Sequence, residues 1–316
     1  MIRASITTAL VAGALAGCQC GTKERSTPIV AEPLVVTRTE VFPRLYAAKI
    51  SRLAIARQSE PSVVLERQAS GRWRLVEPIA EDADQRAVKF ALSELERLEW
   101  VERAVAHGPD RWADYQATPA EVVTLTVTHD GTALAPIHLA QKRVARIGDH
   151  PDLFTIHHVS HFTFARELRF WRDRVVSHFE PAEVTAVELV LGARRALIDR
   201  VPAAPPTADQ PAADPDGWTL REAKPALTAV DAEAMNLAFR RMISLEGQDI
   251  VAIDRAAAGL DAPRARIILH RGEARTELRL GADAPDGGVY AGDDQRPRVL
   301  LLSRADAALI APDLWR

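Results

Sequence analysis

A motif that occurs twice constrains the fold of this 316-residue chain more than any other feature. Gly71-Arg72-Trp73-Arg74-Leu75 is followed by Pro78, and Gly217-Trp218-Thr219-Leu220 is followed by Pro225. Beyond each proline the same residue types recur at the same spacing, namely Asp84, Ala91, Leu98 and Glu99, then Asp231, Ala238, Leu245 and Glu246. Internal repetition of this kind indicates that each stretch is one structural unit. We expect two similar tandem units, residues 42–174 and 175–316.

Each unit is predicted to be α+β, with a mainly antiparallel sheet and one or two helices. Short apolar stretches at residues 50–55, 63–65 and 73–75 alternate with polar turns, which is typical of strands. Apolar residues then recur at helical spacing, after Asp82 and Gln85, which resemble a capping box. These helical positions are Val88, Leu92, Leu95 and Leu98 in the first unit and Met235, Phe239 and Met242 in the second.

The remainder of each unit is predicted to contain further strands. Asp130-Gly131 and Arg271-Gly272 have the composition of hairpin turns, and residues 154–156 and 299–302 have that of strands. A last helix is expected from Ser160, as N-cap, to Trp171. Residues 201–216 are rich in Pro, Ala and Asp, so we expect a surface loop there.

The N-terminus has the pattern of a signal peptide. Arg3 precedes a short apolar stretch that ends at Leu15-Ala16-Gly17-Cys18. This ending resembles the lipobox of bacterial lipoproteins, which implies cleavage after Gly17, acylation of Cys18 and anchoring in the lipid bilayer. Residues 1–17 are then the signal peptide and residues 18–41 a flexible tether. A metal site or disulfide formed by Cys18 and Cys20 is the alternative, but a structural zinc site needs four ligands and the chain has two cysteines.

The net charge and the N-terminal sequence limit the kinds of partner that we expect for this protein. The formal net charge is -3, which argues against nucleic-acid binding, since that function usually gives a basic chain. Beyond the signal peptide no apolar stretch is long enough to span a bilayer. We expect a protein of the cell envelope that faces the periplasm. Gln19, not Asp, follows Cys18, and this slightly favours the outer over the inner membrane.

The order of these features resembles the DUF4340 family of bacterial envelope proteins. The resemblance rests on the Gly-x-Trp-x-Leu motif with its proline, the helix that follows, a Gly-Leu-Asp-x-Pro element at residues 259–263 and the Arg172-Asp173 pair. The first unit departs from the pattern, since it has Tyr115-Gln116-Ala117 before Pro119. Members of the family are often associated with gliding-type ABC transporter systems, so the resemblance implies an envelope context.

The strongest metal-like cluster consists of histidines. His150, His157, His158 and His161 lie close in sequence, and His157 and His161 have the i, i+4 spacing of two ligands on one helical face. A strand is predicted to lead into the cluster, however, and in an extended segment His157 and His158 point to opposite faces. We therefore predict no metal site and no cofactor, with His157 and His161 as the candidates if a metal does bind.

Other residue patterns favour structural roles. The carboxylate pairs Asp82/Asp84 and Asp293/Asp294 fit helix starts or solvated turns better than acid–base catalysis. Gly281 and Asp286-Gly287-Gly288 are predicted to form hairpin turns. Trp73 and Trp218 could stack on a sugar or a peptide, but their position before a helix favours core packing. No nucleophile motif is present.

These features together predict a non-catalytic lipoprotein that interacts with another envelope protein. An ABC transporter component is one candidate partner, and pairing of an edge strand with a partner segment is one mode of binding. Arg172 and Asp173 are expected to make ion pairs at the junction of the two units. Two alternatives are a small-ligand site in the cleft between the units and a metal-dependent hydrolase that uses the histidines.

Overall fold

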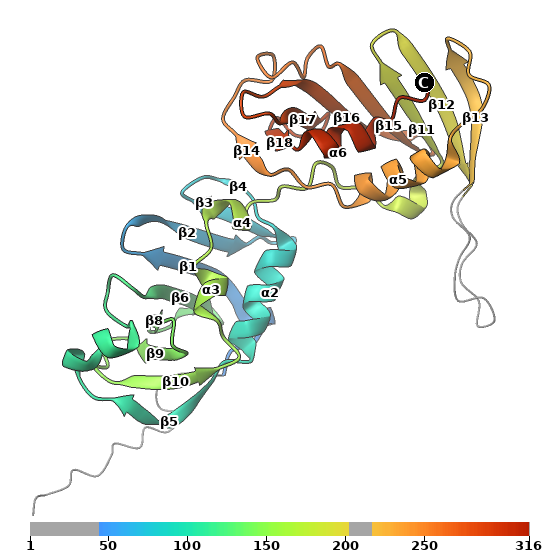
Figure 1. The fold of residues 1–316 in the computed structure, drawn as a ribbon. Coiled ribbons are helices and arrows are strands. Elements are labelled where there is room, and N and C mark those ends of the chain that lie inside the picture. The colour runs from blue at the N-terminus through green and yellow to red at the C-terminus, as the bar shows by residue number, and fades with distance from the viewer. Residues whose placement is uncertain (1–43, 202–216, 316) are drawn as a thin grey trace, which may run out of the picture. The chain divides into compact units, whose positions relative to one another are not determined.

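The computed structural model describes residues 44–201 and 217–315, and it contains two β-sheets with helices on them (Figure 1). Every strand pairing is antiparallel. We call the sheet of β1–β10 with helices α2–α4 the first unit, and the sheet of β11–β18 with helices α5 and α6 the second unit. The predicted α+β architecture with two similar units is confirmed.

The first unit has ten strands and three α-helices. Its strands are β1 (Ile50–Arg57), β2 (Glu60–Arg67), β3 (Trp73–Glu77), β4 (Glu81–Asp82), β5 (Glu99–Ala106), β6 (Val123–His129), β7 (Thr132–Ala133), β8 (Ile137–Leu139), β9 (Val144–Ile147) and β10 (Leu153–His157). Its helices are α2 (Gln85–Glu96), α3 (His161–Phe164) and α4 (Leu168–Trp171), with short 3₁₀ helices at Ala47–Lys49, Pro109–Arg111 and Ala113–Tyr115.

The second unit has eight strands and two α-helices. Its strands are β11 (Ala186–Leu191), β12 (Arg194–Val201), β13 (Gly217–Lys224), β14 (Asp249–Val251), β15 (Ala265–Arg271), β16 (Ala274–Asp283), β17 (Val289–Asp293) and β18 (Val299–Leu302). Its helices are α5 (Ala232–Ile243) and α6 (Arg304–Ile310), and a 3₁₀ helix at Pro181–Glu183 precedes the sheet.

The two sheets have the same strand order. The first sheet is ordered β4-β3-β2-β1-β6-β8-β9-β10-β5, and the second is ordered β13-β12-β11-β15-β16-β17-β18-β14. Strand for strand, β3 corresponds to β13, β1 to β11, β6 to β15, β10 to β18 and β5 to β14. The first sheet adds only the short strands β4 and β7, so the two units share one topology.

The long helices α2 and α5 occupy equivalent places and bury equivalent residues. Asp84 accepts hydrogen bonds from the N–H groups of Arg86 and Ala87, and Asp231 accepts one from Ala234, so both aspartates are N-caps. Ala91 and Ala238 are fully buried in the cores beneath the helices. The predicted capping box of Asp82 and Gln85 is wrong. Gln85 is the first helical residue, and its side-chain amide bonds to the backbone of Trp73.

The predicted single helix from Ser160 to Trp171 is also wrong, because it is two short helices. α3 ends at Phe164 and α4 begins at Leu168. The guanidinium of Arg57 donates to the carbonyl oxygens of Ala165 and Arg166, at 2.9 and 3.3 Å. These carbonyl groups are drawn toward β1, which interrupts the helix between its two halves.

Two of the turns predicted from glycine positions are correct, and one is not. Asp130 and Gly131 both have positive φ, 54° and 79°, as a tight hairpin between β6 and β7 requires. Asp286–Gly288 also forms the predicted turn, between β16 and β17. Gly281, however, lies inside β16, where a Cβ atom would overlap the carbonyl oxygen of Ala258. A close approach of two backbones, and not a turn, requires glycine there.

Candidate functional site

The repeated motif, Gly-x-Trp-x-Leu in the first unit and Gly-Trp-x-Leu in the second, is structural in both units. Trp73 is buried in the first core, with the Arg67 guanidinium 5.1 Å from its ring. Trp218 is half-buried, donates its Nε1–H to Asn236 at 2.9 Å and packs against Phe239. Neither ring is therefore available as an open stacking surface.

The leucines of the two motifs lie on the same strands as the tryptophans, and the prolines follow directly after those strands. Leu75 is fully buried in the first core, and Leu220 packs against the second core. Pro78 and Pro225 each follow a cis peptide bond. Trp171 is buried in the first core, and Trp315 donates its Nε1–H to the carbonyl oxygen of Pro225.

Arg172 and Arg174 lie in the segment that joins the two units, and both bind backbone carbonyl groups near β14. Arg172 is ion-paired with Glu81 and donates to the carbonyl oxygen of Ile250 at 3.0 Å. Arg174 donates to the carbonyl oxygens of Gly247 and Gln248, at 2.9 and 3.2 Å. The Arg172 contacts therefore hold the joining segment both to β4 and to the second sheet.

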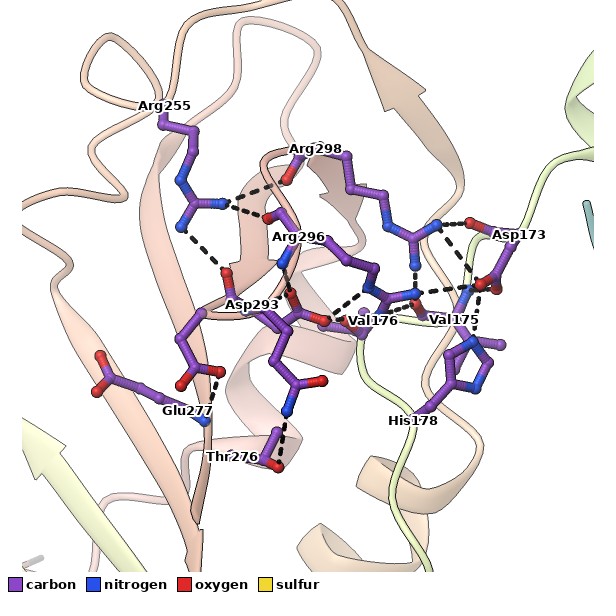
Figure 2. A network of polar contacts seen from close by, with 12 residues as sticks. Asp173, Val175, Val176, His178, Arg255, Thr276, Glu277, Asp293, Arg296 and Arg298 are labelled. Atoms are coloured by element: carbon purple, nitrogen blue, oxygen red, sulfur yellow. Dashed lines mark hydrogen bonds and ion pairs between the residues drawn. The ribbon is translucent and has the colours of Figure 1, made fainter. Parts of the chain in front are cut away.

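Asp173 is the centre of a buried network that we call the Arg–Asp cluster, formed by Asp173, Asp293, Arg296 and Arg298 (Figure 2). The Asp173 side chain is 4% exposed. Its Oδ2 atom lies 2.7 Å from His178 Nε2 and 3.1 Å from Arg296 Nη1. Its Oδ1 atom accepts the backbone N–H of Val175 at 3.1 Å.

The two arginines of the cluster also bind the backbone of the joining segment. Arg296 donates to the carbonyl oxygens of Val175 and Val176, at 3.1 and 2.8 Å. Arg298 donates to the carbonyl oxygens of Asp173 and Val175. Residues 173–176 are thus held to the loop between β17 and β18 by side-chain and main-chain contacts together, as Figure 2 shows.

Asp293 anchors that loop from the other side. Its side chain is 1% exposed, and its Oδ2 atom accepts from both Nε and Nη2 of Arg296, at 2.9 and 2.6 Å, in a charge-assisted ion pair. It also accepts the backbone N–H groups of Gln295 and Arg296. Arg255 then donates to the carbonyl oxygens of Asp293, Arg296 and Arg298. Asp293 therefore satisfies free backbone N–H groups, as expected, but the expectation that it is solvated is wrong, because the residue is buried and ion-paired.

The cluster is electrically balanced. Burial alone would raise the pKa of Asp173, but the hydrogen bond from His178 and the charge of Arg298 outweigh it and lower this pKa from its ordinary value of 3.8. Burial lowers the pKa of Arg298, and the like charge of Arg296 adds to that effect. Two aspartates against two arginines, each with hydrogen bonds, meet the conditions under which buried charges are tolerated. This arrangement fixes geometry and leaves no carboxylate poised for acid–base chemistry.

Sequence reasoning found only one member of this cluster. Asp173 was a predicted junction residue, but Asp293 was interpreted as a turn residue, and Arg296 and Arg298 were not singled out. The available signal is the Arg296-Pro297-Arg298 spacing three residues after Asp293. Its meaning depends on the joining segment passing beside the loop, which no local pattern reports.

The histidines do not share a helical face. His157 is the last residue of β10 and is exposed, whereas His161 is the first residue of α3 and is 92% buried, with Nε2 at 3.3 Å from the carbonyl oxygen of Glu121. His150 Nδ1 accepts the N–H of Asp152. Across residues 44–201 and 217–315, no three His, Cys, Asp or Glu side chains are grouped closely enough to hold a metal ion.

The predicted lipobox lies outside the described residues, with Leu15, Ala16, Gly17 and Cys18 all in the 1–43 segment. The same is true of the signal peptide at 1–17, the tether at 18–41 and most of the loop predicted at 201–216. Within the described ranges, no helix combines the length and the apolar character needed to cross a membrane.

Comparison with known proteins gives one match. No curated protein and no solved structure matches the chain. A family model described as "Domain of unknown function (DUF4340)" matches residues 73–258. This match begins at the tryptophan of the first motif, runs through the second motif and α5, and covers more than half of the 316 residues. The chain therefore belongs to the DUF4340 family.

Proposed function

We propose that this protein is a non-catalytic lipoprotein of the cell envelope that binds another envelope protein through the exposed edge of the first sheet. Acylated Cys18 would anchor it in the bilayer, and the two units would face the periplasm. The lipobox-like Leu15-Ala16-Gly17-Cys18 sequence supports the anchor. Stable anchoring needs more than one acyl chain, since each buried CH₂ contributes only about 0.8 kcal/mol.

The main observation behind the proposal is the open edge of strand β5. It is eight residues long and ends the first sheet, and no other strand of the described residues pairs with its outer edge. An edge strand offers backbone donors and acceptors to an extended segment of a partner. Val101 and Val105 on this strand are 41% and 40% exposed, so a partner strand would also find apolar side chains there.

The equivalent edge of the second sheet is less suited to this role. Strand β14 has three residues, and Arg172 already donates to the carbonyl oxygen of its Ile250. The opposite edge of that sheet is β13, where Arg221, Glu222 and Lys224 are exposed. Charged side chains on an edge strand disfavour pairing with another chain. Strand β5 also exposes Glu99 and Arg103, but it adds the exposed apolar side chains of Val101 and Val105, whereas no large apolar side chain of β13 is exposed. The partner segment is therefore assigned to β5.

An envelope transporter subunit is the partner that we expect first. The support is the association of the DUF4340 family with gliding-type ABC transporter systems. The acidic and basic groups of the Arg–Asp cluster are bound to each other and to the backbone, which supports an interaction role over catalysis.

The test is chemical crosslinking in the native envelope followed by purification of the tagged full-length protein. The wild type should capture a reproducible partner. A Val101→Glu, Val105→Glu double variant should lose at least 80% of that partner, because charge on the strand disfavours pairing. Thr219→Glu, an exposed change on β13, is the matched control and should keep the capture. Equal capture by the wild type and the β5 variant would refute the assignment of the edge.

A separate variant tests the anchor. Cys18→Ser removes the acylated sulfur without changing the described fold. It should move the protein from the membrane fraction to the soluble fraction, and metabolic labelling with a fatty acid should lose its signal. Retention of Cys18→Ser in the membrane would contradict lipid anchoring.

A further inference from the structure

A cavity of about 480 Å³ with both polar and apolar lining residues lies in the first unit, between the end of α2, the turn that joins β8 to β9, and the start of α3. Its lining includes Glu94, Gln141, Arg143, His157, His158 and Phe162. Small-molecule sites in proteins have volumes of roughly 300–1,000 Å³. The cavity therefore has the size of a ligand site.

Several polar groups of the lining have no partner among the described residues. Arg143 and Gln141 are exposed to solvent at the edge of the cavity, and neither the guanidinium nor the side-chain amide makes an ion pair or hydrogen bond within the described residues. The imidazole of His157 contacts only the ring of His158, at 6.3 Å between centroids. Polar groups that face a cavity without partners are available to a ligand.

The backbone conformation of two lining residues also supports a binding site. Arg143 and His158 have φ values of 57° and 63°, in the left-handed region that residues with a Cβ atom rarely occupy. Such conformations collect at binding sites, where the surrounding structure holds them in place. Here both residues border one cavity.

A cavity in the second unit is a useful contrast, because its charged groups are already paired within the chain and are not available to a ligand. That cavity is lined by Arg194, Arg264 and Arg304, but each is paired with a carboxylate. Asp313 binds the first at 2.8 Å, and Asp283 binds the other two at 2.7 and 3.3 Å. Its arginines already have the anionic partners that Arg143 lacks.

The one buried carboxylate of the first cavity is already satisfied by the chain. Glu94 accepts the backbone N–H of Ser160 through Oε2 and the hydroxyl of Thr163 through Oε1, both at 3.1 Å. His158 lies 3.8 Å from Glu99, a loose contact. Arg143 is thus the charge that remains without a counterpart at this site.

We propose that this cavity binds a small molecule that carries an anionic group beside an apolar part. The Arg143 guanidinium would take the anionic group, a carboxylate or phosphate, in a charge-assisted pair, and the His157 ring would donate a further hydrogen bond. Phe162, which is 64% exposed, would cover the apolar part. The site goes beyond the partner-binding role of β5 and does not depend on it.

Titration calorimetry on the full-length protein in detergent tests the proposal, with benzoate as the probe and benzyl alcohol as its neutral counterpart. Benzoate should bind, and benzyl alcohol should bind at least tenfold more weakly. Arg143→Gln should reduce benzoate affinity at least tenfold, while Arg143→Lys, which keeps the charge, should retain part of it. Lys142→Gln is the matched control in the same turn and should stay within twofold.

Two results would refute the proposed ligand site. One is equal affinity for benzoate and benzyl alcohol, and the other is unchanged benzoate affinity in Arg143→Gln. The proposed ligand site would also be refuted if the wild type bound neither benzoate nor inorganic phosphate at 10 mM. This concentration is on the order of the dissociation constant expected for a weak, single-group ligand. Circular dichroism of each variant confirms that it is folded. Because no partner protein is present, failure here leaves the β5 proposal intact.

Discussion

The same turn is built in both units from different residues. In the second unit, Gly259 has φ of 72° and its N–H bonds to Ala256, while the N–H of Leu260 bonds to Arg255. In the first unit, Gln116 has φ of 53° and bonds to Ala113, while Ala117 bonds to Trp112. The apparent departure of the first unit from the Gly-Leu-Asp-x-Pro pattern therefore preserves the backbone and changes only its side chains.

The edges of the two sheets differ far more than their cores. The first unit ends in the eight-residue β5, whereas the second ends in the three-residue β14 beside the joining segment. The second unit has the buried Arg–Asp cluster, and the first has a cavity whose arginine is unpaired among the described residues. In the described part of the chain, one topology thus provides a unit with a long open edge and an unpaired arginine, and a unit whose charges fix its own structure.

The largest effect should come from a glycine that one unit has and the other lacks. Gly281 follows Leu280 in β16, and the equivalent residue after Leu139 is Ala140. Gly281→Ala would push a Cβ atom into the carbonyl oxygen of Ala258, so we expect a loss of about 3 kcal/mol or more in unfolding free energy. Ala140→Gly should cost only about 1 kcal/mol. Urea unfolding of both variants measures the difference, and equal losses would contradict the close backbone approach at Gly281.

A loss of similar size is expected in the Arg–Asp cluster. Asp173→Asn leaves Arg298 without its buried ion-pair partner and leaves Arg296 with Asp293 alone, which should lower the unfolding free energy by about 3 kcal/mol. Asp149→Asn, an exposed change in the first unit, should alter it by about 0.5 kcal/mol or less. Hydrogen exchange read by mass spectrometry should localise the Asp173 effect to residues 173–178 and 293–298. An effect spread evenly over both units would argue against a local clamp.

Smaller and opposite effects are expected in the shared turn. Gln116→Gly removes a Cβ atom from a left-handed residue and should stabilise the protein by about 0.5 kcal/mol, after the entropy cost of glycine. Gly259→Ala should destabilise it by about 1–2 kcal/mol, because alanine is strained at positive φ and its Cβ would lie 3.0 Å from the N atom of Ala282. The same sign for both substitutions in thermal melts would show that the two turns are not equivalent.

The smallest effect on the unfolding free energy is expected from mild acid, which should destabilise the first unit before the second. Burial lowers the pKa of His138 and His161 below 6.5, so their contribution to stability is present above pH 6.5 and is lost as the pH falls below it. The lowered pKa of Asp173 makes its contribution present above about pH 3.8 and lost only below that. Hydrogen exchange at pH 5 corrected for intrinsic rates should therefore increase in the first unit alone. Earlier opening of residues 173–178 would contradict this order.

The parts of the fold that local patterns control were predictable from the sequence. Helical spacing located α2 and α5, and the composition of Asp130-Gly131 identified a hairpin turn. The errors arose where a distant group decides the local structure. Arg57 interrupts the helix after Phe164, and Ala258 requires glycine within β16. Arg296 pairs with Asp293 and also binds the backbone of the joining segment, and the spacing of these residues in the sequence does not predict that contact.

The central claim is that the β5 edge of the first unit is the surface that meets a partner. Site-specific photo-crosslinking in the native envelope tests it, with p-benzoylphenylalanine at Val101 on β5 and, in a separate chain, at Thr219 on β13. The account predicts one discrete crosslinked partner from Val101 and none from Thr219. The same partner from Thr219, with no product from Val101, would contradict it.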